Sequence, residues 1–336
     1  MHDHHISTLD EFDRRKLLKG SLIGLGAIFL NNFSNASAAD IKLSGFDKFS
    51  EKVKIFKDSN YYLVESEGLP NHQMMVGINS WQQQVPTIQP YKSSNAWKIP
   101  ISPRLSSKPI SGQGHFLRGA IAVAVNGVPI FNALNNRGED AYLAGELDDF
   151  GGHCGRADDY HYHVAPLHLQ TVVGKSVPIA YALDGFPIYG ELEPDGKTVT
   201  NLDEFNGHLD KKRKYHYHGT KNFPYINGGF RGVVSEVDGQ VSPQPMTKAF
   251  RPAGQPLPGA KIKNFVQTGK NSFELEYQYQ QAMFKISYSA TLTEVEMNFK
   301  SPDGTTRTEI YRRRSEEHTS ELQSRQYLVC RLLLEK

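Results

Sequence analysis

The sequence predicts a mainly β protein, a sandwich or distorted barrel with few helices, on three observations. Apolar runs in the first third are short and broken by Pro, Gly and Asn, as in YYLVESEGLPNH from Tyr61. Further on, FELEYQYQ, MFKISYSA and EVEMNF alternate apolar and polar residues. An apolar repeat with helical spacing is nearly absent. Short or alternating apolar runs between turn residues are typical of antiparallel strands, which must pack in two layers or close on themselves.

Residues 1–38 are expected to be an export signal that does not belong to the fold. Arg14 and Arg15 form a twin arginine, an apolar run follows from Leu22 to Leu30, and Ala36-x-Ala38 offers a cleavage point. The segment resembles a twin-arginine export signal, which implies a periplasmic or secreted protein. The apolar run is too short to cross about 30 Å of hydrocarbon, so we expect no transmembrane anchor in the mature form.

Composition divides the remaining chain into four segments. We expect the main β domain at 39–238, a Pro/Gly-rich linker or extended loop at 239–260, and three or four antiparallel strands at 261–313 with a turn at SPDG. The segment 314–336 begins RSEEHTSELQS and resembles a translated sequencing adapter, so we expect it to be foreign to the natural protein. A short amphipathic helix is the alternative for this tail.

The main domain contains two similar units, at about 121–163 and 179–218. Both begin with I-A-x-A-[VL]-[ND]-G-x-P-I-[FY] and end with L-D-[DE]-F-[GN]-G-H, six variable residues and Y-H-Y-H. One YHYH is expected by chance in about one of a thousand chains of this composition, so a matched pair predicts an internal duplication. Each unit reads as strand, turn, strand, loop and histidine segment.

The histidine segments have the spacing of metal ligands. Residues two apart in a strand point to one side, so His161 and His163 share a side that excludes Tyr160 and Tyr162. With His153, which follows two glycines and can fold back, they can form a three-histidine site with an open coordination position. The second unit repeats the set. The predicted metal ligands are His153, His161, His163, His208, His216 and His218.

Other polar residues near these segments are candidates for supporting roles. Asp148 and Asp203, common to both units, are expected to accept the proton of the non-ligating imidazole nitrogens. Asp184 gives the second unit alone a carboxylate before Gly, which makes it a candidate catalytic acid or base, with a turn role as the alternative. Candidates for the pocket outside the repeat are His72, His115 and Arg231, the last for an anionic group.

Composition limits the metal and the partner. Neutral imidazole suits zinc, iron and copper, and Cys154 is the single cysteine outside the expected foreign tail, so a thiolate-rich site is disfavoured. We rank zinc first, then iron, manganese or copper. The net charge of +2 argues against nucleic acid as a partner and leaves a small molecule or a cell-surface ligand.

The motifs GLPNH, NGVPIF, GGH with YHYH, ALDGFPIYG, NGH with YHYH, and FPYINGGFRG occur in this order between Tyr61 and Gly232. In this set the chain resembles the YHYH-domain family, found largely in exported or surface proteins. The resemblance implies the domain and names no reaction.

The sequence therefore predicts an exported metal-binding β protein with duplicated three-histidine segments. A metal ion with an open position supports a metal-dependent hydrolase or oxidoreductase. The alternative is a non-catalytic surface or structural recognition module, in which ladders of Tyr and His only stabilise the fold. The sequence is compatible both with one site shared by the two histidine segments and with two separate sites.

Overall fold

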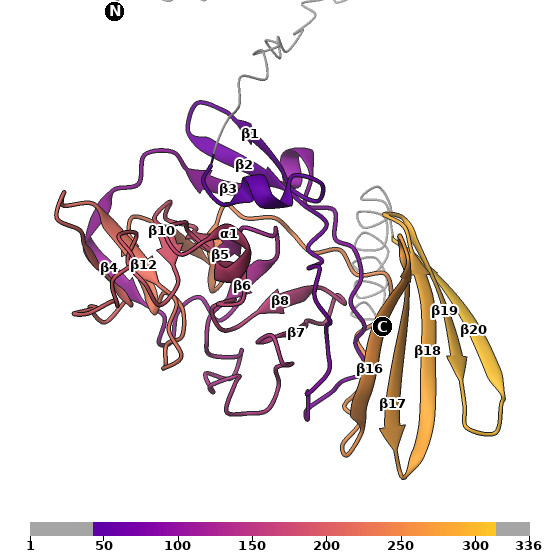
Figure 1. Ribbon diagram of the computed structural model, residues 1–336. Helices are drawn as coiled ribbons and strands as arrows, with labels where there is room; N and C mark the ends of the chain where they lie inside the picture. The colour runs from indigo at the N-terminus through magenta and orange to yellow at the C-terminus, as the bar shows by residue number, and fades with distance from the viewer. Residues whose placement is uncertain (1–42, 314–336) are drawn as a thin grey trace, which may run out of the picture. The chain divides into compact units, whose positions relative to one another are not determined.

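A computed structural model describes residues 43–313, which all fall within one compact unit (Figure 1). The expected export signal at 1–38 and the tail at 314–336 lie outside the described residues. The described chain is mainly β, as predicted, with several sheets and a single α-helix, α1 (Leu169–Val173). In this part of the chain, no helix has the length and apolar character needed to span a membrane.

The first strands form a small antiparallel sheet with the order β1-β2-β3. Strand β4, which follows β3 in the chain, forms a separate two-stranded sheet with β13. The hairpin of β14 and β15 comes after β13. The bounds are β1 (Lys54–Lys57), β2 (Tyr61–Glu65), β3 (Trp97–Pro100), β4 (Leu105–Ser111), β13 (Gly229–Gly232), β14 (Ser235–Val237) and β15 (Gln240–Ser242).

An eight-stranded sheet holds both histidine segments, in the order β11-β12-β10-β9-β5-β6-β8-β7. The antiparallel pair β5 and β9 lies at the centre, and the two halves of the sheet have the same arrangement. In one half, β5 pairs antiparallel with β6, β6 parallel with the YHYH strand β8, and β8 antiparallel with the edge strand β7. In the other half, β9, β10, β12 and β11 pair in the same way. The two YHYH strands therefore lie in opposite halves of the sheet. The bounds are β5 (Ala120–Ala124), β6 (Pro129–Phe131), β7 (Gly152–Cys154), β8 (Tyr160–Tyr162), β9 (Ala180–Ala182), β10 (Pro187–Tyr189), β11 (Gly207–Leu209) and β12 (Tyr215–His218).

The last part of the described chain is a five-stranded antiparallel meander in chain order. We expected three or four strands, and the structure has five. The edge strands β16 and β20 are more exposed than the strands between them, so they show less of the apolar pattern of a buried strand. The bounds are β16 (Lys261–Gly269), β17 (Ser272–Tyr279), β18 (Ala282–Ala290), β19 (Glu294–Lys300) and β20 (Thr306–Arg312).

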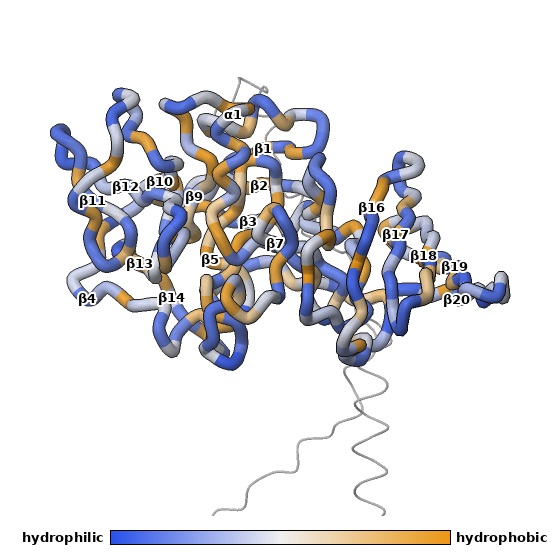
Figure 2. The backbone as a smooth tube through the Cα atoms, turned by 60° about the horizontal axis from the view of Figure 1, so that its bottom comes forward, coloured by the Kyte–Doolittle hydropathy of each residue, from blue (hydrophilic) through white to orange (hydrophobic). Residues whose placement is uncertain are grey.

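One hydrophobic core runs from the eight-stranded sheet to this meander. Every residue of β5 is buried, which fits its run of Ala, Ile and Val at the centre of a sheet covered on both faces. The meander contributes Phe273 and Leu275 to the core, and the Tyr288 hydroxyl donates a hydrogen bond to the Pro86 carbonyl at 2.6 Å. Figure 2 shows the apolar residues of β5 among more hydrophilic outer loops.

Candidate metal centres

The first histidine cluster forms where β7 lies antiparallel to β8. His153 faces His161 in the strand register, and its Nε2 lies 3.0 Å from Nε2 of His163. One ligand atom of each of these three residues falls within 4.8 Å of the others. Ligands that each lie about 2 Å from one ion are separated by roughly 3–4 Å, so the three imidazoles have the spacing that a shared ion requires.

A glycine turn brings β7 back beside β8. Gly151 has φ +81°, a conformation that strains other residues, and a Cβ on Gly152 would lie 2.5 Å from the Tyr160 hydroxyl and 2.7 Å from the His161 carbonyl oxygen. The Asp148 carboxylate closes the turn, because its Oδ1 accepts hydrogen bonds from the Phe150 and Gly152 amides at 2.9 and 3.0 Å. The sequence GGH is thus what places His153 opposite the YHYH strand.

Backbone carbonyls fix the orientation of the imidazoles. Nδ1 of His163 lies 2.5 Å from the Asn132 carbonyl oxygen, and Nδ1 of His161 lies 3.0 Å from that of Asp159. Because a carbonyl oxygen only accepts, each Nδ1 carries the proton and each Nε2 keeps a free lone pair. The lone pairs are therefore available to a metal ion, in the arrangement usual for ligating histidines.

Burial favours the neutral form of two of these imidazoles, those of His153 and His163. It lowers the pKa of His163 to about 3, with a smaller effect from His161, and it moves the pKa of His153 well below the usual value. An imidazole that is neutral at physiological pH is in the form that binds metal, so protons compete weakly for this cluster.

The second cluster, between β11 and β12, repeats this geometry. His208 faces His216 in the register, with 3.1 Å between their Nε2 atoms. Nδ1 of His218 donates to the Gly190 carbonyl at 2.7 Å, and burial lowers the pKa of His218 to about 4. The clusters belong to opposite ends of the eight-stranded sheet, so the histidines form two separate groups.

The second cluster contains a carboxylate that the sequence analysis missed. Glu193 Oε1 lies 3.0 Å from His208 Nε2, and its Oε2 lies 3.3 Å from His216 Nε2. Phe131 and Tyr189 occupy the same position in the two repeats. Four residues further on, Glu193 of the second unit corresponds to Asn135 of the first. The Asn135 side chain instead bonds Glu139 and Glu146 within its own loop. The second cluster therefore offers four ligands, whereas the described residues give the first cluster three.

Asp148 and Asp203 do not bond the imidazoles. The Tyr160 hydroxyl donates to Asp148 at 2.7 Å and the Tyr215 hydroxyl donates to Asp203 at 2.8 Å. The remaining carboxylate oxygens accept from the backbone amides of the turns before β7 and β11. Backbone carbonyls thus take the place that we expected for these carboxylates, which instead join each turn to a tyrosine of the YHYH strand.

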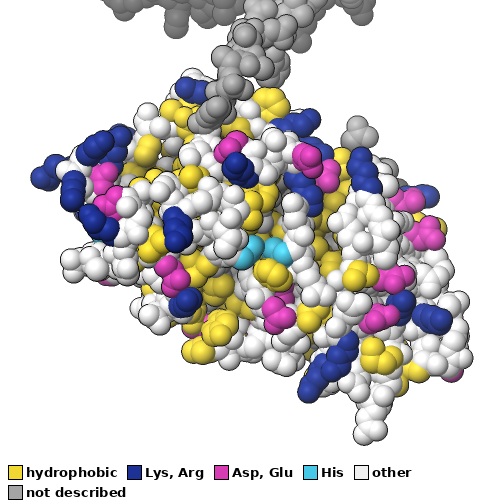
Figure 3. All heavy atoms as spheres, viewed as in Figure 1, with side chains coloured by type: hydrophobic (Ala, Val, Ile, Leu, Met, Phe, Trp, Pro, Cys, Tyr) yellow, Lys and Arg dark blue, Asp and Glu magenta, His cyan; other side chains and the backbone are white. Residues whose placement is uncertain are grey.

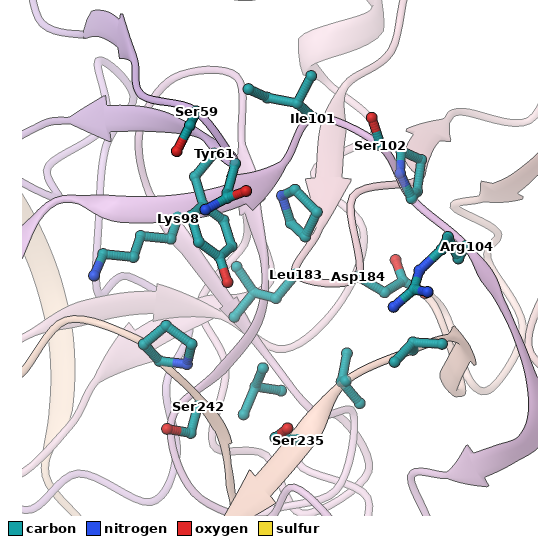
Figure 4. A pocket seen from close by; sticks show the side chains of 17 residues that line it. Ser59, Tyr61, Lys98, Ile101, Ser102, Arg104, Leu183, Asp184, Ser235 and Ser242 are labelled. Carbon is teal, nitrogen blue, oxygen red and sulfur yellow. The ribbon is translucent and has the colours of Figure 1, made fainter.

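Asp184 lies away from both clusters. It accepts hydrogen bonds from the Tyr217 hydroxyl and from the Gly232 amide at 2.9 Å, and Tyr217 points to the side of β12 opposite to the histidines. Burial raises the Asp184 pKa to about 6. The residue lines a cavity of about 380 Å³, which Lys98 and Arg104 also line (Figure 4). Its carboxylate is thus not placed to act beside a metal ion of either cluster.

The three pocket candidates lie in three different places. Nε2 of His72 is 2.7 Å from the Tyr162 hydroxyl, on the tyrosine side of β8, and the His72 ring stacks on Phe150. His115 pairs with Glu236 at 2.7 Å, half exposed. Arg231 lines a cavity of about 280 Å³ together with His208, which makes it the candidate that adjoins a cluster. Histidine side chains also surface among apolar groups on the face drawn in Figure 3.

Comparison with known proteins supports the predicted domain. Residues 96–200 match the family model described as YHYH protein, a range that contains the first histidine cluster and ends before the three histidines of the second. Comparisons with curated proteins and with solved structures gave no match. The YHYH domain and the histidine clusters are compatible with a β protein that binds metal.

Proposed function

We propose that this chain is an exported metal-binding protein with two unlike centres, an open one at His153, His161 and His163 and a closed one completed by Glu193. The observation that carries the proposal is the difference in ligands, since Glu193 approaches Nε2 of all three histidines of the second cluster. Among the described residues, the carboxylate that contacts the first cluster is Asp159, which faces Nδ1 of His161 at 3.5 Å and is not one of the possible ligands. In zinc proteins, sites with four protein ligands are typically structural, and three-ligand sites with an open position are typically catalytic.

The donor atoms fit the predicted metals. Neutral imidazoles and one carboxylate suit zinc first, then iron, manganese or copper. Cys154 is adjacent to His153 but alternates with it along β7 and so points to the other side, and burial raises its thiol pKa well above the usual value. A thiolate ligand is therefore not part of the proposal.

The proposed reaction is hydrolysis at the first centre. The three imidazoles would hold a zinc ion, which would supply activation of water for hydrolysis near neutral pH, because bound zinc lowers the pKa of water to about 7. Of the chain's own residues, His153, His161 and His163 hold the ion. The carbonyls of Asn132 and Asp159 keep two of the rings in place.

Hydrolysis of p-nitrophenyl acetate by the metal-loaded full chain tests this proposal. We expect a His161→Ala and His163→Ala double variant to lose the activity, and the matched His216→Ala and His218→Ala variant to keep it where the protein stays folded. Equal rates in the two double variants, or a rate that survives loss of the first cluster, would contradict the proposal. A cobalt-loaded sample gives a second reading, since only an open site should show a visible spectrum that changes with pH near 7.

Export is proposed from the sequence signal alone. Replacement of Arg14 and Arg15 by Lys should leave the precursor in the cytoplasm, and undiminished appearance of the protein outside it would refute this location. The proposed partner is a small molecule or a cell-surface ligand.

A non-catalytic recognition module remains the second candidate, favoured by the tyrosine network. Tyr160 with Asp148 and Tyr215 with Asp203 link each YHYH strand to its turn without any metal. In this alternative both centres are structural. It predicts that removal of metal by a chelator lowers the unfolding temperature of the protein. It also predicts no hydrolysis, either by the metal-free protein or after metal is restored.

A further inference from the structure

A turn rich in basic residues joins the two strands of the second metal centre. Residues 210–214, with the sequence DKKRK, begin two residues after His208 and end two residues before His216. We call this segment the basic turn. Its four cationic side chains are all exposed: Lys211, Lys212, Arg213 and Lys214. Figure 3 shows Lys and Arg side chains gathered at the end of the molecule where Figure 1 places β12.

The backbone and Asp210 hold the basic turn without help from the cationic side chains. The Asp210 carboxylate accepts hydrogen bonds from the Lys212 and Lys214 amides at 2.7 and 2.8 Å. The Arg213 amide donates to the Asp210 carbonyl at 2.9 Å. Within residues 43–313, none of the four cationic side chains forms an ion pair or a hydrogen bond. The fold therefore does not use these charges.

The matching turn of the first unit has the opposite charge and is partly buried. Residues 155–159, GRADD, join β7 to β8 at the same position of the repeat. They include one cation and two carboxylates, whereas the basic turn includes four cations and one carboxylate. Asp158 and Asp159 are only 3% and 5% exposed, and Asp158 pairs with Arg251. The same element is thus a buried anchor in one unit and an exposed cationic surface in the other.

The acidic residues around the basic turn already have partners. A hydrogen bond from Lys197 lowers the pKa of Asp195, with a smaller effect from Lys211, so Asp195 lies near the turn but is paired with Lys197. Glu193 faces the histidines of the second centre. Four consecutive unpaired cations attract anions locally, although the whole chain carries a net charge of only +2.

We propose that the basic turn binds an anionic polysaccharide of the cell surface, one with sulfate, phosphate or carboxylate groups along its chain. Neighbouring cations match a polymer with closely spaced charges, because contact between them releases the counterions of the polymer. The proposal gives the chemistry of the cell-surface ligand proposed above, and it rests on that proposed function for the location alone.

The surroundings of the turn favour a polysaccharide over a membrane or a nucleic acid. Attachment to a membrane surface usually adds apolar side chains beside the cations, and residues 210–214 contain none. The adjoining Leu209 is 46% exposed, but it lines the cavity that Arg231 also lines. Nucleic-acid binding usually needs a basic surface that extends over a domain, whereas here the charge is confined to one turn.

Binding of heparin, a sulfated polysaccharide, to the full chain tests the inference. We expect Lys211→Gln, Lys212→Gln and Lys214→Gln together to weaken the affinity roughly 100-fold at low salt, about fivefold for each cation. The dependence of the affinity on salt concentration should also become shallower, since fewer counterions are released. Absence of heparin binding by the unchanged protein would overturn the inference.

A matched variant separates the basic turn from general attraction of anions. Lys261→Gln, Lys263→Gln and Lys270→Gln together remove the same charge from three exposed lysines of the meander. This variant should bind heparin as the unchanged protein does. Equal weakening in the two triple variants would show that the turn is not the binding surface.

Vesicles of phosphatidylglycerol and phosphatidylcholine in equal parts test a membrane as the partner. We expect the unchanged protein to bind them more weakly than heparin. Tighter binding to vesicles than to heparin, lost in the triple variant of the turn, would overturn the polysaccharide assignment. Heparin binding in solution needs neither export nor hydrolysis, so its absence would leave the proposed function standing. Heparin binding by protein that takes up no metal would do the reverse.

Discussion

At the scale of single residues, Glu193 and Asn135 make the two centres different. Both follow the second strand of their unit by four residues, in loops closed by the equivalent bridges Leu134 with Asp140 and Leu192 with Thr198. Glu193 turns its carboxylate toward the histidines, whereas Asn135 is held by hydrogen bonds in its own loop. A difference of one side chain therefore decides how many possible ligands each cluster offers.

Substitution of Glu193 should weaken the second centre selectively. Glu193→Gln is expected to lower its metal affinity roughly 100-fold or more, because loss of groups outside the ligand shell already costs about 10- to 100-fold. Competition with a coloured chelator measures the affinity. Glu191→Gln, a nearby surface carboxylate paired with Lys221, is the control and should behave as the unchanged protein. Equal affinities in the two variants would show that Glu193 is not a ligand.

Asp184 should make stability depend on pH. Burial raises its pKa from 3.8 to about 6, so the folded protein holds this proton more tightly than the unfolded chain does. The resulting stabilisation is present below about pH 4 and is lost as the pH rises to about 6, roughly 3 kcal/mol for a shift of about two units. We expect the free energy of unfolding of the unchanged protein, measured in urea, to fall by about this amount relative to that of Asp184→Asn as the pH rises over that range. A difference that stays flat with pH would contradict the assignment.

At the scale of elements, each centre depends on a glycine turn that returns an edge strand to its YHYH strand. The clusters exist because β7 pairs with β8 and β11 with β12, and both pairings leave no room for a side chain at the glycine before the histidine. A Cβ on Gly207 would clash with the Tyr215 hydroxyl, much as one on Gly152 would clash with that of Tyr160. A substitution that breaks the pairing of the edge strand should therefore also abolish metal binding at that centre.

Gly152→Ala tests this link. The added methyl group must displace Tyr160 or the backbone of β8, which typically costs about 1–3 kcal/mol, and we expect the first centre to lose its metal while the second keeps its own. Gly269→Ala is the control, because its Cβ would make only an ordinary contact of 3.4 Å with Ser272. Thermal unfolding and metal analysis give the two readings. Full metal retention in Gly152→Ala would show that the centre does not need the close approach of β7.

At the scale of the whole molecule, one buried ion pair ties distant segments to the loop of the first centre. Asp158 lies in the loop that joins His153 to His161 along the chain, and its carboxylate accepts two hydrogen bonds from Arg251, at 2.7 and 2.9 Å. The same carboxylate accepts from the Val85 amide at 3.1 Å. The segment expected to be a linker is therefore anchored to this loop through Arg251.

Removal of Arg251 should destabilise the protein strongly. Arg251→Ala leaves the Asp158 carboxylate buried without its partner, and loss of one member of a buried pair costs about 3–5 kcal/mol. Lys197→Ala removes an exposed pair with Asp195 and should change the free energy of unfolding little. Urea unfolding compares the two variants. Similar small effects would mean that Asp158 reaches solvent once Arg251 is gone.

Local rules made part of this architecture predictable from the sequence. Alternation along a strand put His161 and His163 on one side, and the apolar pattern gave the middle strands of the meander. Glu193 was missed because its approach to the histidines depends on the path of a loop. The partners of Asp148 and Asp203 were missed because a turn amide and a tyrosine compete for the same carboxylate. The duplication itself stays a prediction, supported by the matching strand order of the two halves.

Elemental analysis of the natively expressed chain tests the central claim most directly. Two unlike centres predict two transition-metal ions per chain, one lost in the His161→Ala and His163→Ala variant and the other in the His216→Ala and His218→Ala variant. Purified protein that holds no stoichiometric metal, or a double variant that still holds both ions, would contradict the account.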